Sequence, residues 1–157
     1  MSSPVLNPQP VNQFAPDSFR GVNQPNPAQV GYEDRPFEYV YSPPNDELTA
    51  DQFLNPDSLS IHTDSDFLLY GWYISLYTGE FQIQLTDSNG YQLQSGLVNS
   101  GAISQSASDP TVFSPAHPFP AGGKIQIAIQ DLSGDTNPLQ IVFKGVKRFR
   151  RPIRATR

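Results

Sequence analysis

Few residues in this chain have the types and spacing that catalysis or metal binding requires. His62 and His117 are the only histidines, and neither has a sequence neighbour that would make it a general base. The run Asp64-Ser65-Asp66 begins like a calcium loop but lacks the further ligands and the distal Glu, so a turn explains it better. Gly122-Gly123 precedes an expected strand, whereas phosphate-binding glycines open a helix. We therefore expect no catalytic residue, no metal site and no cofactor.

The residues best suited to contact another protein lie toward the two ends of the chain. Aromatic side chains are spread among prolines in the first forty residues, and Lys and Arg surround a phenylalanine near the C-terminus. Arginine and aromatic side chains carry a disproportionate share of the affinity at protein interfaces. The candidate interaction residues are Phe14, Phe19, Tyr32, Phe37, Tyr39, Lys147, Arg148, Phe149, Arg150 and Arg151.

The charge is divided unevenly along the chain, although the formal net value is only −5. Seven of the ten Lys and Arg residues lie within residues 144–157, and all fifteen acidic residues precede them. A basic end on an acidic body can contact nucleic acid, an acidic partner, or the acidic surface of a second copy. No recognition helix or RNA-binding aromatic motif is visible, so we expect protein partners rather than nucleic acid.

Other compositional features exclude several classes of protein. The chain has no cysteine, which rules out disulfides and thiolate chemistry. The first twenty residues contain four prolines and no apolar run, so we expect neither a signal peptide nor a membrane span there. The longest apolar stretch, residues 67–77, is too short to cross a bilayer as a helix. We expect no membrane partner.

Residues 1–58 contain ten of the sixteen prolines and are expected to form an extended arm. Its large apolar residues favour an arm that becomes ordered on a partner, and a disordered tail is the alternative. Within the arm, the alternation over residues 37–41 is compatible with a first strand that Pro43-Pro44 would end. Residues 45–54 offer one short helical turn.

Residues 59–149 contain short alternating strands separated by turn sequences. The clearest is Phe81 to Thr86, where apolar residues alternate with polar ones, and Asn89-Gly90 follows as a hairpin signal. Seven or eight such strands without a long helix predict an all-β, jelly-roll-like antiparallel β-sandwich. The expected organisation is an extended N-terminal arm (1–58), the sandwich (59–149) and a basic C-terminal tail (150–157).

Four segments of this sandwich resemble small jelly-roll structural proteins of tailed bacteriophages, particularly capsid cement or decoration proteins. They read SDFLLYGW (65–72), FQIQLTDSNGY (81–91), PAGGKIQI (120–127) and IVFKGVKRF (141–149). The resemblance implies a non-enzymatic virion protein that is assembled in the host bacterial cytoplasm, binds the major capsid protein and stabilises the head. A closed homo-oligomer, for which a trimer is one option, would match the lattice symmetry.

Two other functions stay open at this point. A head–tail connector or tail component could use the same sandwich. A carbohydrate-binding module is suggested by Trp72 with Tyr70, Tyr73 and Tyr77, although rings in so hydrophobic a strand are expected to pack in the core.

Overall fold

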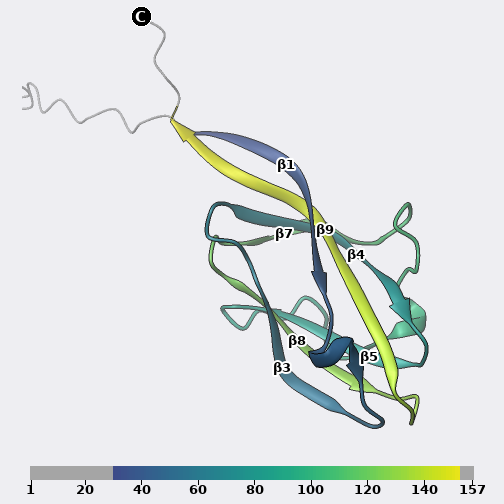
Figure 1. Cartoon of the computed structure of the whole chain (residues 1–157). Helices are drawn as coiled ribbons and strands as arrows, with labels where there is room; N and C mark the ends of the chain where they lie inside the picture. Colours follow the sequence, from purple (N-terminus) through teal and green to yellow (C-terminus); the bar gives the residue numbers. More distant parts are fainter. Residues whose placement is uncertain (1–29, 153–157) are drawn as a thin grey trace, which may run out of the picture.

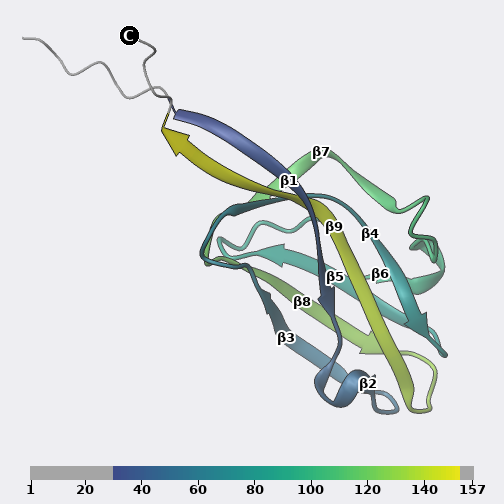
Figure 2. The ribbon, with the colours of Figure 1, turned by 45° about the horizontal axis from the view of Figure 1, so that its top comes forward.

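The chain folds as two antiparallel β-sheets packed face to face (Figures 1 and 2). A computed structural model describes residues 30–152. The first sheet has the strand order β1-β9-β4-β7 with β2 paired to β9, and the second has the order β3-β8-β5-β6. The elements are β1 (Val30–Tyr41), η1 (Pro44–Asp46), β2 (Glu47–Leu48), β3 (Phe53–Ser60), β4 (Asp66–Tyr77), β5 (Phe81–Asp87), β6 (Val98–Asn99), η2 (Ser100–Ala102), β7 (Thr111–Phe119), β8 (Lys124–Asp131) and β9 (Asn137–Pro152).

The pairing of the strands is nested, which confirms the predicted jelly-roll sandwich. Outermost in the sequence, β1 pairs with β9; inside them β3 pairs with β8, β4 with β7, and β5 with β6. The first two of these pairs lie in opposite sheets, as do the last two. This arrangement buries one face of each sheet against the other.

The sandwich begins at Val30, earlier than the boundary at residue 59 that we expected from the prolines. Both β1 and β3 belong to it, and each forms an edge of its sheet. Pro36 lies within β1 and Pro56 within β3. An edge strand makes ladder bonds on one side only, so it tolerates a residue without an N–H on its open side. The prolines therefore mark sheet edges in this part of the chain.

Two smaller expectations also change. The helical turn expected over residues 45–54 is a short 3-10 turn, Pro44–Asp46, followed by β2 and the start of β3. Residues 150–152, which we expected to begin the basic tail, belong to β9, which continues to Pro152. Residues 153–157 and 1–29 lie outside the described part of the chain.

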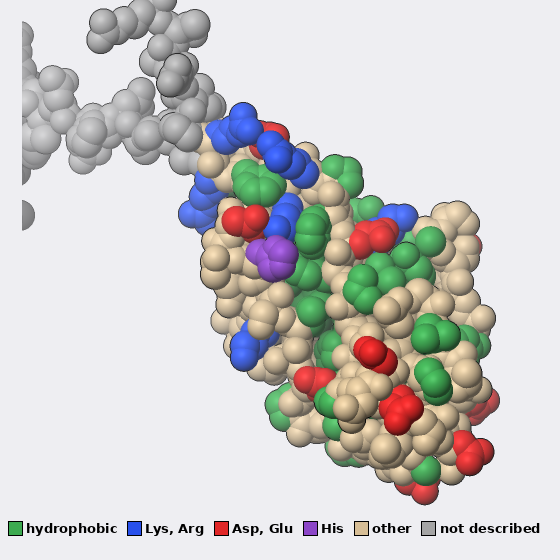
Figure 3. Space-filling view, in the orientation of Figure 1, with side chains coloured by type: hydrophobic (Ala, Val, Ile, Leu, Met, Phe, Trp, Pro, Cys, Tyr) green, Lys and Arg blue, Asp and Glu red, His purple; other side chains and the backbone are tan. Residues whose placement is uncertain are grey.

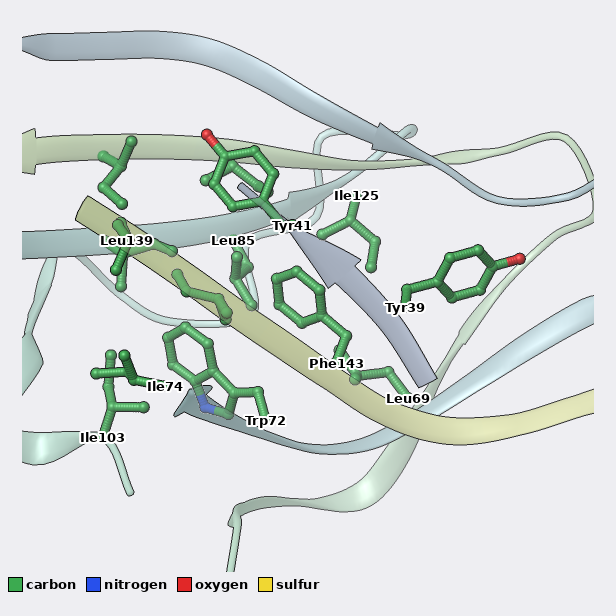
Figure 4. Close-up of a cluster of buried hydrophobic side chains, with 14 of the residues drawn as sticks. Tyr39, Tyr41, Leu69, Trp72, Ile74, Leu85, Ile103, Ile125, Leu139 and Phe143 are labelled. Atoms are coloured by element: carbon green, nitrogen blue, oxygen red, sulfur yellow. The ribbon is translucent and has the colours of Figure 1, made fainter. Parts of the chain in front are cut away.

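The core between the sheets is made of the inward-facing residues that the alternation predicts. Ile83 and Leu85 from β5 and Ile125 from β8 are fully buried. Trp72 from β4 stacks on Phe143 from β9, with ring centroids 6.3 Å apart (Figure 4). Trp72 is buried, as its position in the most hydrophobic strand predicts. The outward face of the second sheet carries glutamines, including Gln82, Gln84, Gln126 and Gln130.

Two buried polar side chains fix the turns at the end of the sandwich where β9 begins. The carboxylate of Asp131 accepts hydrogen bonds from the backbone N–H groups of Asp51, Ser133 and Gly134. The amide oxygen of Asn137 accepts from the N–H of Gly79, and its nitrogen donates to the Gly79 carbonyl. These bonds tie the β4–β5 turn to the β8–β9 turn and satisfy groups that burial would otherwise leave unpaired.

We expect Gly145→Ala to destabilise the fold, because β9 crosses β4 too closely there for any side chain. A Cβ at this position would clash with the Leu68 carbonyl oxygen and come within 2.5 Å of the Phe67 ring. Both groups are held by the β4–β9 ladder. The free energy of unfolding, measured by chemical denaturation, should fall by about 3 kcal/mol. Gly96→Ala is the matched control, since nothing lies within 4 Å of its Cβ position; an unchanged midpoint for Gly145→Ala would contradict the expectation.

Candidate functional site

The two strands that carry most of the candidate residues extend together beyond the body of the sandwich. Strand β4 begins at Asp66, which lies opposite Arg148, so among the described strands the last residues of β9 pair with β1 alone. The result is a projecting ribbon, which we define as residues 30–36 of β1 and 146–152 of β9 (Figures 1 and 2). Residues 146–148 still pair with β4 at its base, and the ribbon is two-stranded from residue 149 onward. The ribbon brings the two ends of the described chain to one place.

Interaction residues that sequence reasoning assigned to two separate ends thus lie on one pair of strands, with Tyr32 opposite Arg150 in the ribbon and Phe37 and Tyr39 below it. Tyr32, Phe37 and Tyr39 lie on β1 and face a partner strand that carries Lys147, Arg148, Phe149, Arg150 and Arg151. Phe14 and Phe19 lie outside the described residues. Cross-strand neighbours share a face of the ribbon, so these residues divide into two sets.

On the inner face of the ribbon, which continues the core side of the first sheet, arginine side chains link the two strands. The guanidinium of Arg35 lies 5.2 Å from the centroid of the Phe149 ring, and its Nε donates to Glu33 at 2.8 Å. Arg151 forms an ion pair with the same Glu33. The hydrogen bond from Arg35, helped by the charge of Arg151, lowers the pKa of Glu33.

The outer face of the ribbon carries a bidentate ion pair. Arg148 donates through Nε and Nη2 to the two carboxylate oxygens of Asp34, at 2.8 and 2.6 Å. This hydrogen bonding lowers the pKa of Asp34 and raises that of Arg148. The same guanidinium lies 5.4 Å from the centroid of the Tyr32 ring, and the neighbouring Arg150 reaches Asp66 at 3.6 Å. An isolated two-stranded ribbon is marginal in water, so these cross-strand pairs are needed to close it.

Lys147 anchors the base of the ribbon to the sandwich. Its ammonium donates to both oxygens of Asp64 at 3.1 and 3.0 Å, lies 2.8 Å from His62 Nδ1, and sits 4.4 Å from the centroid of the Phe37 ring. The hydrogen bond from Lys147, with a second from Ser65, lowers the pKa of Asp64. The contact with His62 is a hydrogen bond only while Nδ1 carries no proton.

The candidate residues differ in how accessible they are. Tyr39 is 5% exposed and Lys147 7%, so both serve the fold, and Phe37 is half-buried against the core. Tyr32 is 59% exposed and the Arg150 side chain 73%, which leaves them free to contact a partner. The alternation of Phe37, Tyr39 and Tyr41 along β1 is the signal that would have placed Tyr39 inside.

A second surface, which the candidate residues did not include, is the outward face of the first sheet. Val142 is buried there although it is not part of the core cluster, because cross-strand neighbours on the outside cover it. Figure 3 shows several hydrophobic side chains beside β1 and β9 on the side turned to the viewer, interspersed with charged ones. We call this surface the outer apolar face; its residues are Pro36, Val40, Leu68, Tyr73, Val112, Pro118, Val142 and Val146.

The remaining polar contact of interest is a histidine–aspartate pair beside a small hollow. His117 Nε2 lies 3.3 Å from Asp87, and the exposed Tyr91 ring stacks on the imidazole at 5.4 Å. Burial opposes ionisation of Asp87, but the N–H groups of Tyr91 and Asn89 and the His117 ring lower its pKa. Because Asp87 closes the β5 turn through these N–H groups, the pair has a structural explanation.

Over residues 30–152, no group of three or more His, Cys, Asp or Glu side chains is placed to hold a metal ion. Within the same residues, no helix is long and apolar enough to span a bilayer. No protein-family model, curated protein or solved structure matches the chain. The functional argument therefore depends on the ribbon and the outer apolar face.

We expect Arg148→Lys to loosen the ribbon without unfolding the sandwich. Lysine keeps the charge but loses the two parallel hydrogen bonds to Asp34, because only a guanidinium presents that fork. Hydrogen exchange of the Tyr32 to Arg35 amides should become roughly threefold faster, while exchange in β5 and β8 stays unchanged. Arg150→Lys is the matched control, since Arg150 makes no bidentate pair. Equal exchange rates in the two variants would contradict the role given to Arg148.

We also expect the ribbon to open in acid. The pKa values of Glu33 and Asp34 are lowered in the folded chain, so their pairing contributes fully above the ordinary carboxyl values of about 4.3 and 3.9. That contribution is lost as the pH falls through the lowered values. NMR titration should show both carboxylates titrating below their ordinary values, with cross-strand contacts of the ribbon disappearing over the same range. Titration at or above the ordinary values would refute the pairing.

Proposed function

We propose that this chain is a non-enzymatic structural protein of a virion, a capsid cement or decoration protein that binds the major capsid protein lattice and stabilises the head. On this proposal it is assembled in the host bacterial cytoplasm and ends in the virion. The observation that carries the proposal is the pair of extended contact surfaces, the ribbon and the outer apolar face, on a body in which the buried Asp131 and Asn137 hold turns.

The architecture supports the proposal by analogy only. Eight-stranded jelly rolls recur in viral capsid proteins and also in lectins and cupins, so the fold alone selects no function. The outward faces of the two sheets distinguish between possible functions better than the fold does. A sheet that faces water on one side normally carries polar residues there, as the glutamine face of the second sheet does. The first sheet instead carries apolar residues on both faces, which favours a protein partner over its outer face.

The lattice contact that we propose therefore uses the outer apolar face. Its two apolar cross-strand rows, Val40–Val142–Tyr73 and Pro36–Val146–Leu68, lie on either side of the charged pair Glu38 and Lys144. Lys144 Nζ lies 3.9 Å from Glu38, and both side chains are partly exposed. A charged pair between two apolar rows fixes the orientation of the partner, while the apolar rows supply the buried surface.

A head–tail connector or tail component would use the same surfaces and differs in copy number and location on the particle. The carbohydrate-binding alternative has no observation in its favour. Trp72 is enclosed between the sheets against Phe143, so it offers no open ring on which a sugar could stack. Tyr73 and Tyr77 are half-buried in the same strand.

The test uses heads of the source virus that lack this protein. Val40→Lys combined with Val112→Lys adds two charges at exposed positions of the outer apolar face, and we expect roughly tenfold weaker binding to the heads. Gln126→Lys combined with Gln130→Lys adds the same charge to the outward face of the second sheet, and should bind normally.

Occupancy is measured by electron microscopy of the decorated heads and head stability by resistance to heat. Failure of the unchanged protein to bind, or its presence at the neck or tail alone, would overturn the decoration role. Equal binding by both lysine variants would overturn the assignment of the face.

A further inference from the structure

The long edge strands of both sheets are interrupted by proline. Pro36 interrupts β1, Pro56 interrupts β3, and Pro115 and Pro118 interrupt β7. The remaining described edge strands, β2 and β6, are two residues long each. Proline cannot donate to a new ladder, so these edges resist the addition of another strand. Strand addition at the body of the sandwich is therefore disfavoured.

The ribbon is different, because both of its edges contain stretches that no proline interrupts. On β1, residues 31–35 lie beyond Pro36, and on β9, residues 149–151 lie between the end of the β4 pairing and Pro152. Within residues 30–152, residues 149–151 pair with residues 31–33 and with no further strand, and residues 34 and 35 pair only with Arg148 and Lys147. Figures 1 and 2 show the outer part of the ribbon standing away from the body in both views, with no other strand of residues 30–152 beside it.

The charges of the two stretches select which edges can join. The ribbon part of β1 contributes Glu33 and Asp34, and that of β9 contributes Arg148, Arg150 and Arg151. A two-fold contact of β9 with β9 would set arginine against arginine, and one of β1 with β1 would set carboxylate against carboxylate. Like charges directly opposite each other destabilise a strand pair. The one remaining basic residue of the β1 stretch, Arg35, is directed at Glu33 of its own strand.

We propose that copies of this chain associate head to tail, with the open edge of β9 in one copy pairing with the open edge of β1 in the next. This contact sets arginine against carboxylate, as the pairing within one chain already does for Arg148 with Asp34 and Arg151 with Glu33. Arg150 and Tyr32, the most exposed side chains of the ribbon's outer face, are available for it.

Because the contact joins two different edges, every linear assembly of copies has an unpaired β1 edge at one end and an unpaired β9 edge at the other. Such heterologous contacts either close into a ring or grow without limit. We infer a ring of three or more copies whose ribbons form one continuous sheet around the axis. The inference rests on the proposed function, with which the sequence analysis associates a closed homo-oligomer, but it is tested without capsids. Ring formation can therefore fail while head binding holds, and the reverse.

The deciding experiment uses the absence of cysteine from the chain. One preparation carries Gly31→Cys, another carries Phe149→Cys, and each is treated with a short thiol-reactive crosslinker alone and after mixing. Head-to-tail pairing predicts covalent dimers in the mixture and few in either preparation alone. Strong crosslinking of one preparation by itself would indicate a two-fold contact and overturn the proposal, as would an absence of crosslinks in all three samples.

Mass measurement of the unmodified protein by light scattering gives the second readout, for which we expect three or more copies. Arg150→Glu should weaken association roughly tenfold; it removes the 3.6 Å contact with Asp66 but leaves the Arg148–Asp34 and Arg151–Glu33 pairs in place, and Arg150→Lys should associate normally. A monomeric or dimeric unmodified protein would overturn the ring, and full association of Arg150→Glu would overturn the charge argument.

Discussion

The pairing of β1 with β9 is the constraint on which the rest of this structure depends. The ladder runs without interruption from Val30 opposite Pro152 to Tyr41 opposite Ile141. At one end it places Tyr39 beside Phe143 in the core, and at the other it places Asp34 beside Arg148 in the ribbon. Because it joins segments more than a hundred residues apart, it closes the largest loop in the described chain. Hydrophobic burial at the core end offsets that entropy, and the ribbon is then extended by short-range cross-strand pairs.

Much of the fold could be predicted from period-two alternation, because apolar and polar residues alternate along a strand that has one buried face. Ile83 and Leu85 are inside and Gln82 and Gln84 outside, as the pattern requires. Strand β1 was anticipated only over residues 37–41, and most of β3 was not recognised, for a different reason. Proline excludes a residue from the middle of a ladder but not from the open side of an edge strand, and which strand becomes an edge is decided by partners far away in the sequence. Composition of the segment alone carries no information about those partners.

The candidate site was predictable in its residue types but not in its assembly. Arginine and aromatic residues near both ends led to the prediction of a contact surface, yet nothing local shows that Glu33 and Asp34 would meet Arg151 and Arg148. The distribution of charge contained a partial signal, since the basic end had to face acidic residues somewhere in an otherwise acidic chain. Lys147 shows that consecutive basic residues do not all belong to one surface. Its position in the alternation of β9 turns it toward Asp64 and His62, while its neighbours face solvent.

The separation of charge between the two ribbon strands has a consequence for how copies can meet. If acids and bases were mixed along each strand, edges could pair in several registers and with either symmetry, and the open ribbon would be a site of non-specific association. With carboxylates on β1 and most of the arginines on β9, the pairing that closes the ribbon within one chain is also the one favoured between chains. The prolines of β1, β3 and β7 disfavour the competing contacts at the body. Association would then occupy the ribbon edges and leave the outer apolar face of every copy directed toward a different partner.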